Sequence, residues 1–137
     1  MKYVKKVYLN TEKTKYCIVE LYTTRKEMRV AYNKHPSNNA KGSKILGAHC
    51  GYEKYRSTQP RWGVLPETGT VFLSLENCGA GVVAHEIMHA VLWAWKHKRL
   101  KNQYPIVIKN MNEEEKILHN HSYAVMQFYR WYWKVIN

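Results

Sequence analysis

Residues 69–95 read GTVFLSLENCGAGVVAHEIMHAVLWAW, and this stretch decides the fold. Its first part, Thr70–Leu75, is rich in apolar and β-branched residues and predicts a strand. A short turn containing glycine follows. The apolar residues after that turn recur at helical spacing, so a helix is expected over about Ala80–His97. The stretch therefore predicts a strand that leads through a tight turn into a mostly apolar helix.

The predicted helix carries His85-Glu86-Ile87-Met88-His89, which is an H-E-x-x-H motif. Residues i and i+4 share one face of a helix, so His85 and His89 can reach the same ion, with Glu86 beside them. A zinc peptidase needs two neutral imidazole ligands and a carboxylate that takes a proton from the attacking water. We therefore expect a Zn²⁺ site with His85 and His89 as ligands and Glu86 as the general base. Two ordinary helix histidines are the alternative.

A catalytic zinc usually has a third protein ligand and one open position. The chain contains ten Glu and no Asp, so an acidic ligand must be a Glu. Three of them, Glu113–Glu115, open a helix predicted over about Asn112–Val135. Glu114 precedes Ile117 by three residues and Leu118 by four, so it is expected on the inward face. Glu114 is the first candidate, Glu115 and then Glu113 are the alternatives, and all three also suit a helix N-terminus electrostatically.

Histidines in the same predicted helix offer a different third ligand, with His121 ahead of His119. His121 is also a candidate catalytic residue, because from the inward face it could hydrogen-bond the substrate carbonyl oxygen or a zinc ligand. Tyr123 is a weaker candidate for that role. His97 is expected about 12 Å along the helix from His89, too far to share an ion. Leu92 and Trp95 stand where a metzincin has Gly and His, which excludes that variant.

The rest of the chain predicts an α+β fold in one domain spanning residues 1–137. A small antiparallel or mixed sheet is expected to pack on the motif helix and the C-terminal helix. The predicted strands outside the motif stretch are Val4–Leu9, Tyr16–Tyr22 and Ile45–Tyr52. A short helix capped by Thr24 is expected over Arg25–Lys34. Ser37–Ser43 and Glu53–Gly69 are expected to be irregular.

The composition limits which classes of partner and which cellular compartment are expected. The net charge of +12 draws the chain toward polyanions or acidic substrates, although a solvated basic surface is a sufficient explanation. There is no long apolar run and no signal-like N-terminus, so neither a membrane span nor secretion is expected. Three cysteines without C-x-x-C spacing are typical of reduced, partly buried thiols in a cytoplasmic protein.

Residues 69–95, together with NEEEKILHNHSYAVMQFYRW at 112–131, resemble the core of small zincin-type metallopeptidases. The segments are similar to compact zincins of phages and mobile elements, and more distantly to ImmA/IrrE-type peptidases, which cleave repressors. The resemblance covers about the C-terminal half of the chain. It implies an edge strand before the motif helix and a third ligand from a Glu at the head of the following helix, which matches Glu114 best. It also implies a cytoplasmic location, in the host if the protein is phage-encoded.

The leading hypothesis is a zinc-dependent metallopeptidase, a hydrolase acting on a peptide or protein substrate. Zinc lowers the pKa of its water, Glu86 takes the proton and passes it to the leaving amine, and His121 helps to stabilise the oxyanion. An extended substrate is expected to add to Thr70–Leu75 at the edge of the cleft.

The alternative is a basic module on a zincin scaffold that binds nucleic acid or protein. Under this alternative, the chain resembles SprT-type proteases, which act on DNA-bound proteins. Those proteases use a histidine as the third zinc ligand. The five Trp and eleven Tyr could supply stacking platforms for bases. The tryptophans of the two predicted helices, however, are expected to include core-packing residues. They are Trp93, Trp95, Trp131 and Trp133.

Overall fold

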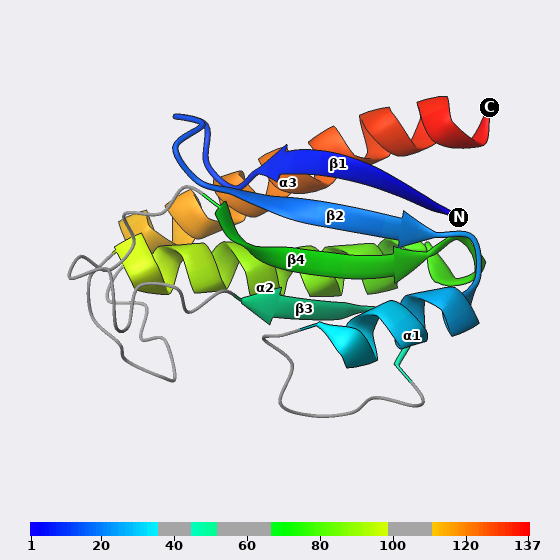
Figure 1. The fold of residues 1–137 in the computed structure, drawn as a ribbon. Helices are drawn as coiled ribbons and strands as arrows, with labels where there is room; N and C mark the ends of the chain where they lie inside the picture. Colours follow the sequence, from blue (N-terminus) through cyan, green and yellow to red (C-terminus); the bar gives the residue numbers. More distant parts are fainter. Residues whose placement is uncertain (36–44, 52–66, 99–110) are drawn as a thin grey trace.

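The computed structural model describes residues 1–35, 45–51, 67–98 and 111–137. Within them, strands and helices build one layered α+β unit (Figure 1). The elements in chain order are β1 (Lys2–Tyr8), β2 (Tyr16–Tyr22), α1 (Arg25–Lys34), β3 (Ala48–Gly51), β4 (Glu67–Ser74), the short 3₁₀ helix η1 (Leu75–Asn77), α2 (Ala80–Lys98) and α3 (Met111–Ile136).

The four strands form a mixed sheet in the order β1-β2-β4-β3. The β1–β2 and β3–β4 pairs are antiparallel, whereas β2 and β4 are parallel. The prediction that the strand before the motif helix lies at the edge of the sheet is wrong, because β4 pairs on both sides. All of β4 after Glu67 is buried, and burial on both faces is typical of a central strand. The edge position next to β4 belongs to β3.

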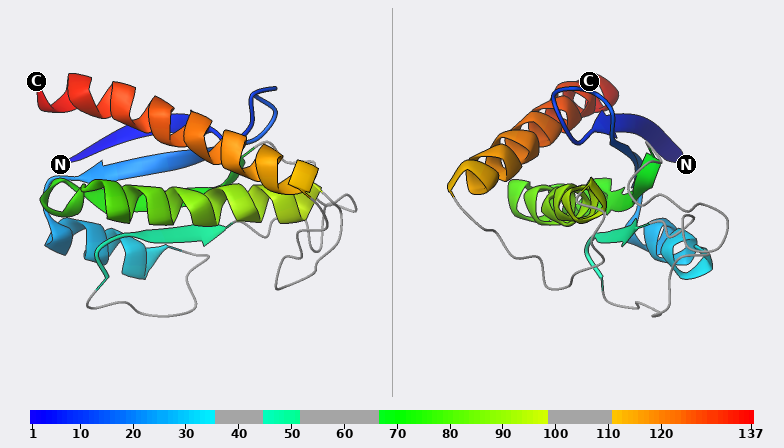
Figure 2. Two further views of the ribbon diagram at one scale, coloured as in Figure 1. Left: turned by 180° about the vertical axis from the view of Figure 1, so that it is seen from behind. Right: turned by 90° about the vertical axis from the view of Figure 1, so that its left-hand side faces the viewer.

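The helices cover the two faces of the sheet unequally (Figure 2). α2 and α3 lie on one face, where Phe128, Ile87 and Val83 are fully buried against inward residues of β1, β2 and β4. α1 lies on the other face, over β4 and the end of β2, and buries Met28 beside Phe72. The main core therefore lies under α2 and α3, and it fixes the motif helix against the sheet.

Local sequence signals explain most element boundaries. β2 and α1 have the predicted bounds, and Thr24 caps α1 by accepting a hydrogen bond from the Glu27 amide. β1 and β4 begin two and three residues earlier than predicted, and β3 is confined to four residues. α3 spans Met111–Ile136, one residue beyond the predicted range at each end. The predicted irregular segments Ser37–Ser43 and Glu53–Gly69 lie outside the described residues, except for residues 67–69, which belong to β4.

The α+β class with a mixed sheet is confirmed, and so is the packing of the motif helix and the C-terminal helix on that sheet. None of the helices in the described part of the chain has the length and apolar character needed to cross a membrane.

Candidate metal centre

The motif residues lie in the first half of α2, where His85 and His89 are exposed. Ile87 and Val83 point into the core and are fully buried, which turns His85 and His89 outward. In the described residues, the ligand atoms of His85, Glu86 and His89 form the one group of three or more that lie within 4.8 Å of one another. The helix therefore brings together the three side chains that the motif predicts.

The two histidines converge on one point. His85 Nε2 and His89 Nε2 are 3.1 Å apart, and their rings are nearly perpendicular at 82°. Two nitrogens bound to one tetrahedral zinc at about 2.0–2.1 Å would be about 3.3 Å apart. A hydrogen bond between the rings needs one N–H donor, whereas a shared cation needs a lone pair from both nitrogens. The observed separation fits two corners of a tetrahedral zinc site.

Glu86 is almost fully buried although it is adjacent to an exposed histidine. Only 7% of the residue is accessible, and its Oε1 atom lies 3.7 Å from His85 Nε2. Burial raises the pKa of the Glu86 carboxyl, and the nearby His85 partly offsets this rise. A carboxylate with a raised pKa is a stronger base than an exposed one. Glu86 thus combines access to the histidine pair with the basicity that proton transfer requires.

Edge strand β3 brings a third histidine to the centre. His49 stacks on His89, with ring centroids 6.5 Å apart and planes inclined by 6°, and it meets Trp93 edge-on. Burial, and to a lesser extent His89, lowers the pKa of His49 to about 3, so its imidazole is neutral. Burial and His85 likewise lower the pKa of His89. Neutral imidazole is the form that binds metal ions.

Glycines on both sides of His49 let α2 approach the edge strand closely. A Cβ on Gly51 would lie 2.2 Å from Trp93 Cε2, inside the indole ring system. A Cβ on Gly47 would lie 3.0 Å from Glu86 Cγ. His49 and Gly51 face the same side of β3 because they alternate in the strand, and Gly47, just before the strand, lies beside Glu86. We call these three residues the β3 wall.

The β3 wall was not predicted from the sequence as part of the site. The available signal was the alternation in Gly47-Ala48-His49-Cys50-Gly51, where glycine recurs two residues before and after a histidine. Glycine inside a strand often marks a close approach by another segment. Which segment approaches could not be predicted, because the register between β3 and α2 depends on tertiary packing.

Glu114, the predicted third ligand, is exposed at the start of α3 and lies outside the His85–Glu86–His89 group. Its expected position on the inward face is wrong, and Leu118 from the same prediction is also exposed. Helix α3 buries a narrower stripe than expected, formed by Ile117, Ala124 and Phe128. Glu115 instead contacts His119, at 3.6 Å, one turn further along the exposed side. The role of Glu114 as a ligand stays a prediction.

His121 lies against the motif helix, but its contact is with the backbone. His121 Nε2 is 2.9 Å from the carbonyl oxygen of Ala84, the residue before His85. A carbonyl only accepts, so Nε2 carries the proton, and in the neutral ring Nδ1 is then an acceptor. In this arrangement His121 holds α3 to the first turn of the motif. Donation to a substrate oxygen stays a prediction, and it requires this contact to break.

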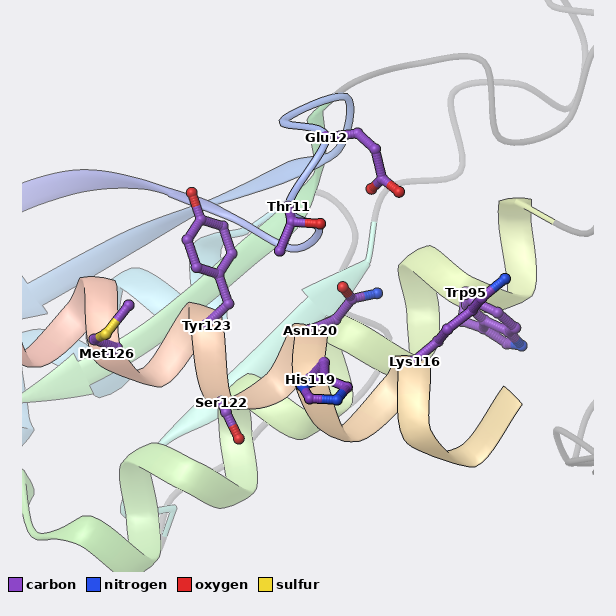
Figure 3. A pocket seen from close by; sticks show the side chains of 9 residues that line it. All are labelled: Thr11, Glu12, Trp95, Lys116, His119, Asn120, Ser122, Tyr123 and Met126. Atoms are coloured by element: carbon purple, nitrogen blue, oxygen red, sulfur yellow. The ribbon is translucent and has the colours of Figure 1, made fainter. Parts of the chain in front are cut away.

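A separate cavity of about 520 Å³ lies between the β1–β2 turn, the end of α2 and the outer side of α3 (Figure 3). His119 and Tyr123 line this cavity, and none of the three motif residues does. His119, the weaker histidine candidate for the third ligand, and Tyr123, the weaker candidate for contacting the substrate, therefore point away from the motif. The lining residues are Thr11, Glu12, Trp95, Lys116, His119, Asn120, Ser122, Tyr123 and Met126.

Comparison with known proteins finds no matching family model, no matching curated protein and no matching solved structure. The resemblance to zincins therefore depends on the motif and its setting alone.

Proposed function

We propose that the protein is a zinc-dependent metallopeptidase in which His85 and His89 hold the metal and Glu86 is the general base. The observation that carries the proposal is the pairing of two converging Nε2 atoms, 3.1 Å apart, with a buried carboxylate beside them. Two histidines that only packed on a helix surface would need neither the convergence nor the buried acid.

Each residue near the centre has a separate role in the proposed reaction. Bound zinc would supply Lewis-acid chemistry and lower the pKa of water toward neutrality. Glu86 accepts the proton of the attacking water and donates it to the leaving amine. The β3 wall excludes solvent from one side of Glu86 and keeps its carboxylate near His85. His121 keeps α3 against the first turn of the motif.

The third ligand in this proposal is Glu114, with Glu115 as the alternative. Both lie in the first two turns of α3, a helix held beside α2 by the buried residues of its inner stripe. Zinc analysis of the Glu114→Ala and Glu115→Ala variants separates the two. The proposal expects loss of bound zinc in the Glu114 variant and retention in the Glu115 variant. The reverse result would assign the position to Glu115, and retention in both would exclude Glu114 and Glu115 as ligands.

An extended substrate would add to β3 rather than to β4. Strand β4 pairs on both sides, whereas no described strand pairs with the outer side of β3. An antiparallel or parallel peptide on that side could donate and accept backbone hydrogen bonds while crossing the metal centre. His49 and Trp93 would then lie beneath the peptide residues nearest the scissile bond.

The test is peptide cleavage by the wild-type protein and by Glu86→Gln. A peptide library incubated with zinc-loaded protein and read by mass spectrometry should show cleavage that falls about 10²–10⁴-fold in the variant. The variant should retain its zinc, because its two histidine ligands are untouched. Full activity in Glu86→Gln would refute the mechanism, and zinc-loaded protein that cleaves no member of the library would refute the peptidase assignment.

A further inference from the structure

The β1–β2 half of the sheet has one face that the described helices leave uncovered. Helices α2 and α3 lie on the opposite face, and α1 covers only the β4 side and the end of β2 (Figures 1 and 2). The antiparallel register places Lys6 opposite Ile18 and Tyr8 opposite Tyr16 on this face. Together with Lys13 from the intervening turn, these residues form what we call the tyrosine–lysine face.

Each tyrosine of the face is paired with a lysine. The Tyr8 and Tyr16 rings meet edge-on with centroids 6.2 Å apart. Lys6 Nζ lies 4.5 Å from the Tyr16 centroid, and Lys13 Nζ lies 5.8 Å from the Tyr8 centroid. Both lysines are exposed, and both rings are partly accessible. Two aromatic rings and two ammonium groups are thus gathered within one short stretch of sheet.

The turn holds Lys13 in place at a conformational cost. Lys13 has a φ of 60°, in the left-handed region that non-glycine residues rarely adopt. The backbone carbonyl of Asn10 accepts a hydrogen bond from the Lys13 amide at 3.2 Å. The Asn10 side chain accepts a hydrogen bond from the Thr14 amide at 3.0 Å and donates one to the Thr14 hydroxyl at 2.7 Å. Asparagine or glycine would adopt this φ at less cost. This turn places Lys13 where its ammonium group reaches the Tyr8 ring.

The acidic residues near the face set the direction of a bound ligand. Glu20 is engaged by Lys2 at 3.7 Å and by the Tyr22 hydroxyl at 2.6 Å. Glu67 of β4 is level with Tyr16, on the side away from β1. Negative groups of a ligand would therefore follow the β1 side, past Lys6 and Lys13. Its uncharged parts would lie over the tyrosines.

We propose that the tyrosine–lysine face binds single-stranded nucleic acid. Bases stack on Tyr8 and Tyr16, and Lys6 and Lys13 swing from the rings to the phosphates. A lysine over an exposed ring is held more weakly than a stacked base, so the exchange favours the ligand. The net charge of +12 adds a long-range attraction to the same class of partner. This inference does not depend on the metal centre.

The test is fluorescence anisotropy with a labelled oligothymidylate of about 12 nucleotides, within the usual site size for such surfaces. Tyr8→Leu and Tyr16→Leu keep apolar packing but remove stacking, and each should weaken binding about 5- to 150-fold without changing its salt dependence. Lys6→Ala and Lys13→Gly should each reduce the slope of log affinity against log salt by about 0.7. Lys13→Gly should at the same time raise the thermal midpoint, because it relieves the strained φ.

Two controls separate this face from general basicity. Lys134→Ala removes an exposed lysine from α3, in the layer on the opposite side of the sheet, and should leave the affinity nearly unchanged. Glu86→Gln should also leave it unchanged, whether or not the protein cleaves peptides. The proposal is overturned if the wild-type protein does not bind the oligonucleotide at low salt. It is equally overturned if Lys134→Ala weakens binding as much as Lys6→Ala, or if polyglutamate competes as well as the oligonucleotide does.

Discussion

The two edge strands of the sheet are built in opposite ways. On β3, glycines let α2 pack directly on the strand, and Trp93 fills the place where a Gly51 side chain would stand. On β1, exposed lysines and partly exposed tyrosines lie on a face without a covering helix in the described chain. Tight packing and fixed geometry are thus concentrated beside the His–Glu–His group. The outer hairpin retains long, adaptable side chains. The β3 edge therefore suits chemistry that depends on fixed distances, and the β1 edge suits binding of a flexible polyanion.

The largest effect on stability is expected from a substitution that disrupts the close packing of α2 on β3. In Gly51→Ala, the new Cβ would lie 2.2 Å from Trp93 Cε2, so the indole ring or the strand must shift. We expect a loss of about 1–3 kcal/mol in the free energy of unfolding, measured by urea denaturation. The matched control is Gly81→Ala in α2, where a Cβ meets nothing within 4 Å. That change should instead stabilise the protein by about 0.5–1 kcal/mol. Equal effects of the two substitutions would contradict the packing described for β3.

A second prediction concerns His49 as a positioning residue. Its ring stacks on His89, and its buried Nε2 has no hydrogen-bond partner in the described residues, so the contact that the structure shows between the two histidines is ring packing. His49→Ala should weaken zinc binding about 2- to 10-fold, which corresponds to the loss of one ring–ring contact. His49→Phe should restore most of the affinity and the visible spectrum of the cobalt-substituted protein. If His49→Ala binds zinc as tightly as wild type while folded, His49 has no such role.

The third prediction concerns the turn between β1 and β2, where Lys13 has a left-handed φ. Lys13→Gly should increase the free energy of unfolding by about 0.5–1 kcal/mol, since relief of the left-handed φ outweighs the added freedom of the unfolded chain. Lys13→Asn, which tolerates the same φ, should behave similarly. Chemical denaturation of both variants measures the effect. Destabilisation by both would show that the lysine side chain, and not the strain, dominates at this turn.

The smallest effect concerns the thiols, of which Cys17 and Cys50 are buried and Cys78 is partly buried. Burial raises the pKa of Cys17 and Cys78 to about 12, and burial with Glu86 nearby raises that of Cys50 to about 11. A thiol reagent at pH 8 should therefore label the native protein slowly and all three cysteines rapidly in denaturant. The folded pKa values exceed the ordinary value of 9.0, so stability is full below pH 9 and declines above it as unfolded thiols ionise. Rapid native labelling would contradict the burial.

The sequence predicted the parts of the site that one helix determines. His85, Glu86 and His89 are spaced four residues apart at most, so helical geometry alone brings them together. The same local reasoning placed β2, α1 and α2. Relations between elements were harder to predict. The position of β4 in the middle of the sheet depends on β3 pairing beyond it, and the His49–His89 contact depends on register across that pair. The exposure of Glu114 depends on the rotation of α3 about its own axis. The spacing of the apolar residues in α3 predicts which face turns inward, but it does not predict that rotation exactly enough to place Glu114.

The most direct test of the central claim is zinc analysis by elemental mass spectrometry of the purified wild-type, Glu86→Gln and His89→Ala proteins. Two Nε2 atoms 3.1 Å apart, with the carboxylate serving as base rather than ligand, predict one zinc per chain in the wild type. They also predict the same content in Glu86→Gln and a large loss in His89→Ala. Absence of zinc from the wild-type protein, or equal zinc in the wild-type and His89→Ala proteins, would contradict the metal centre.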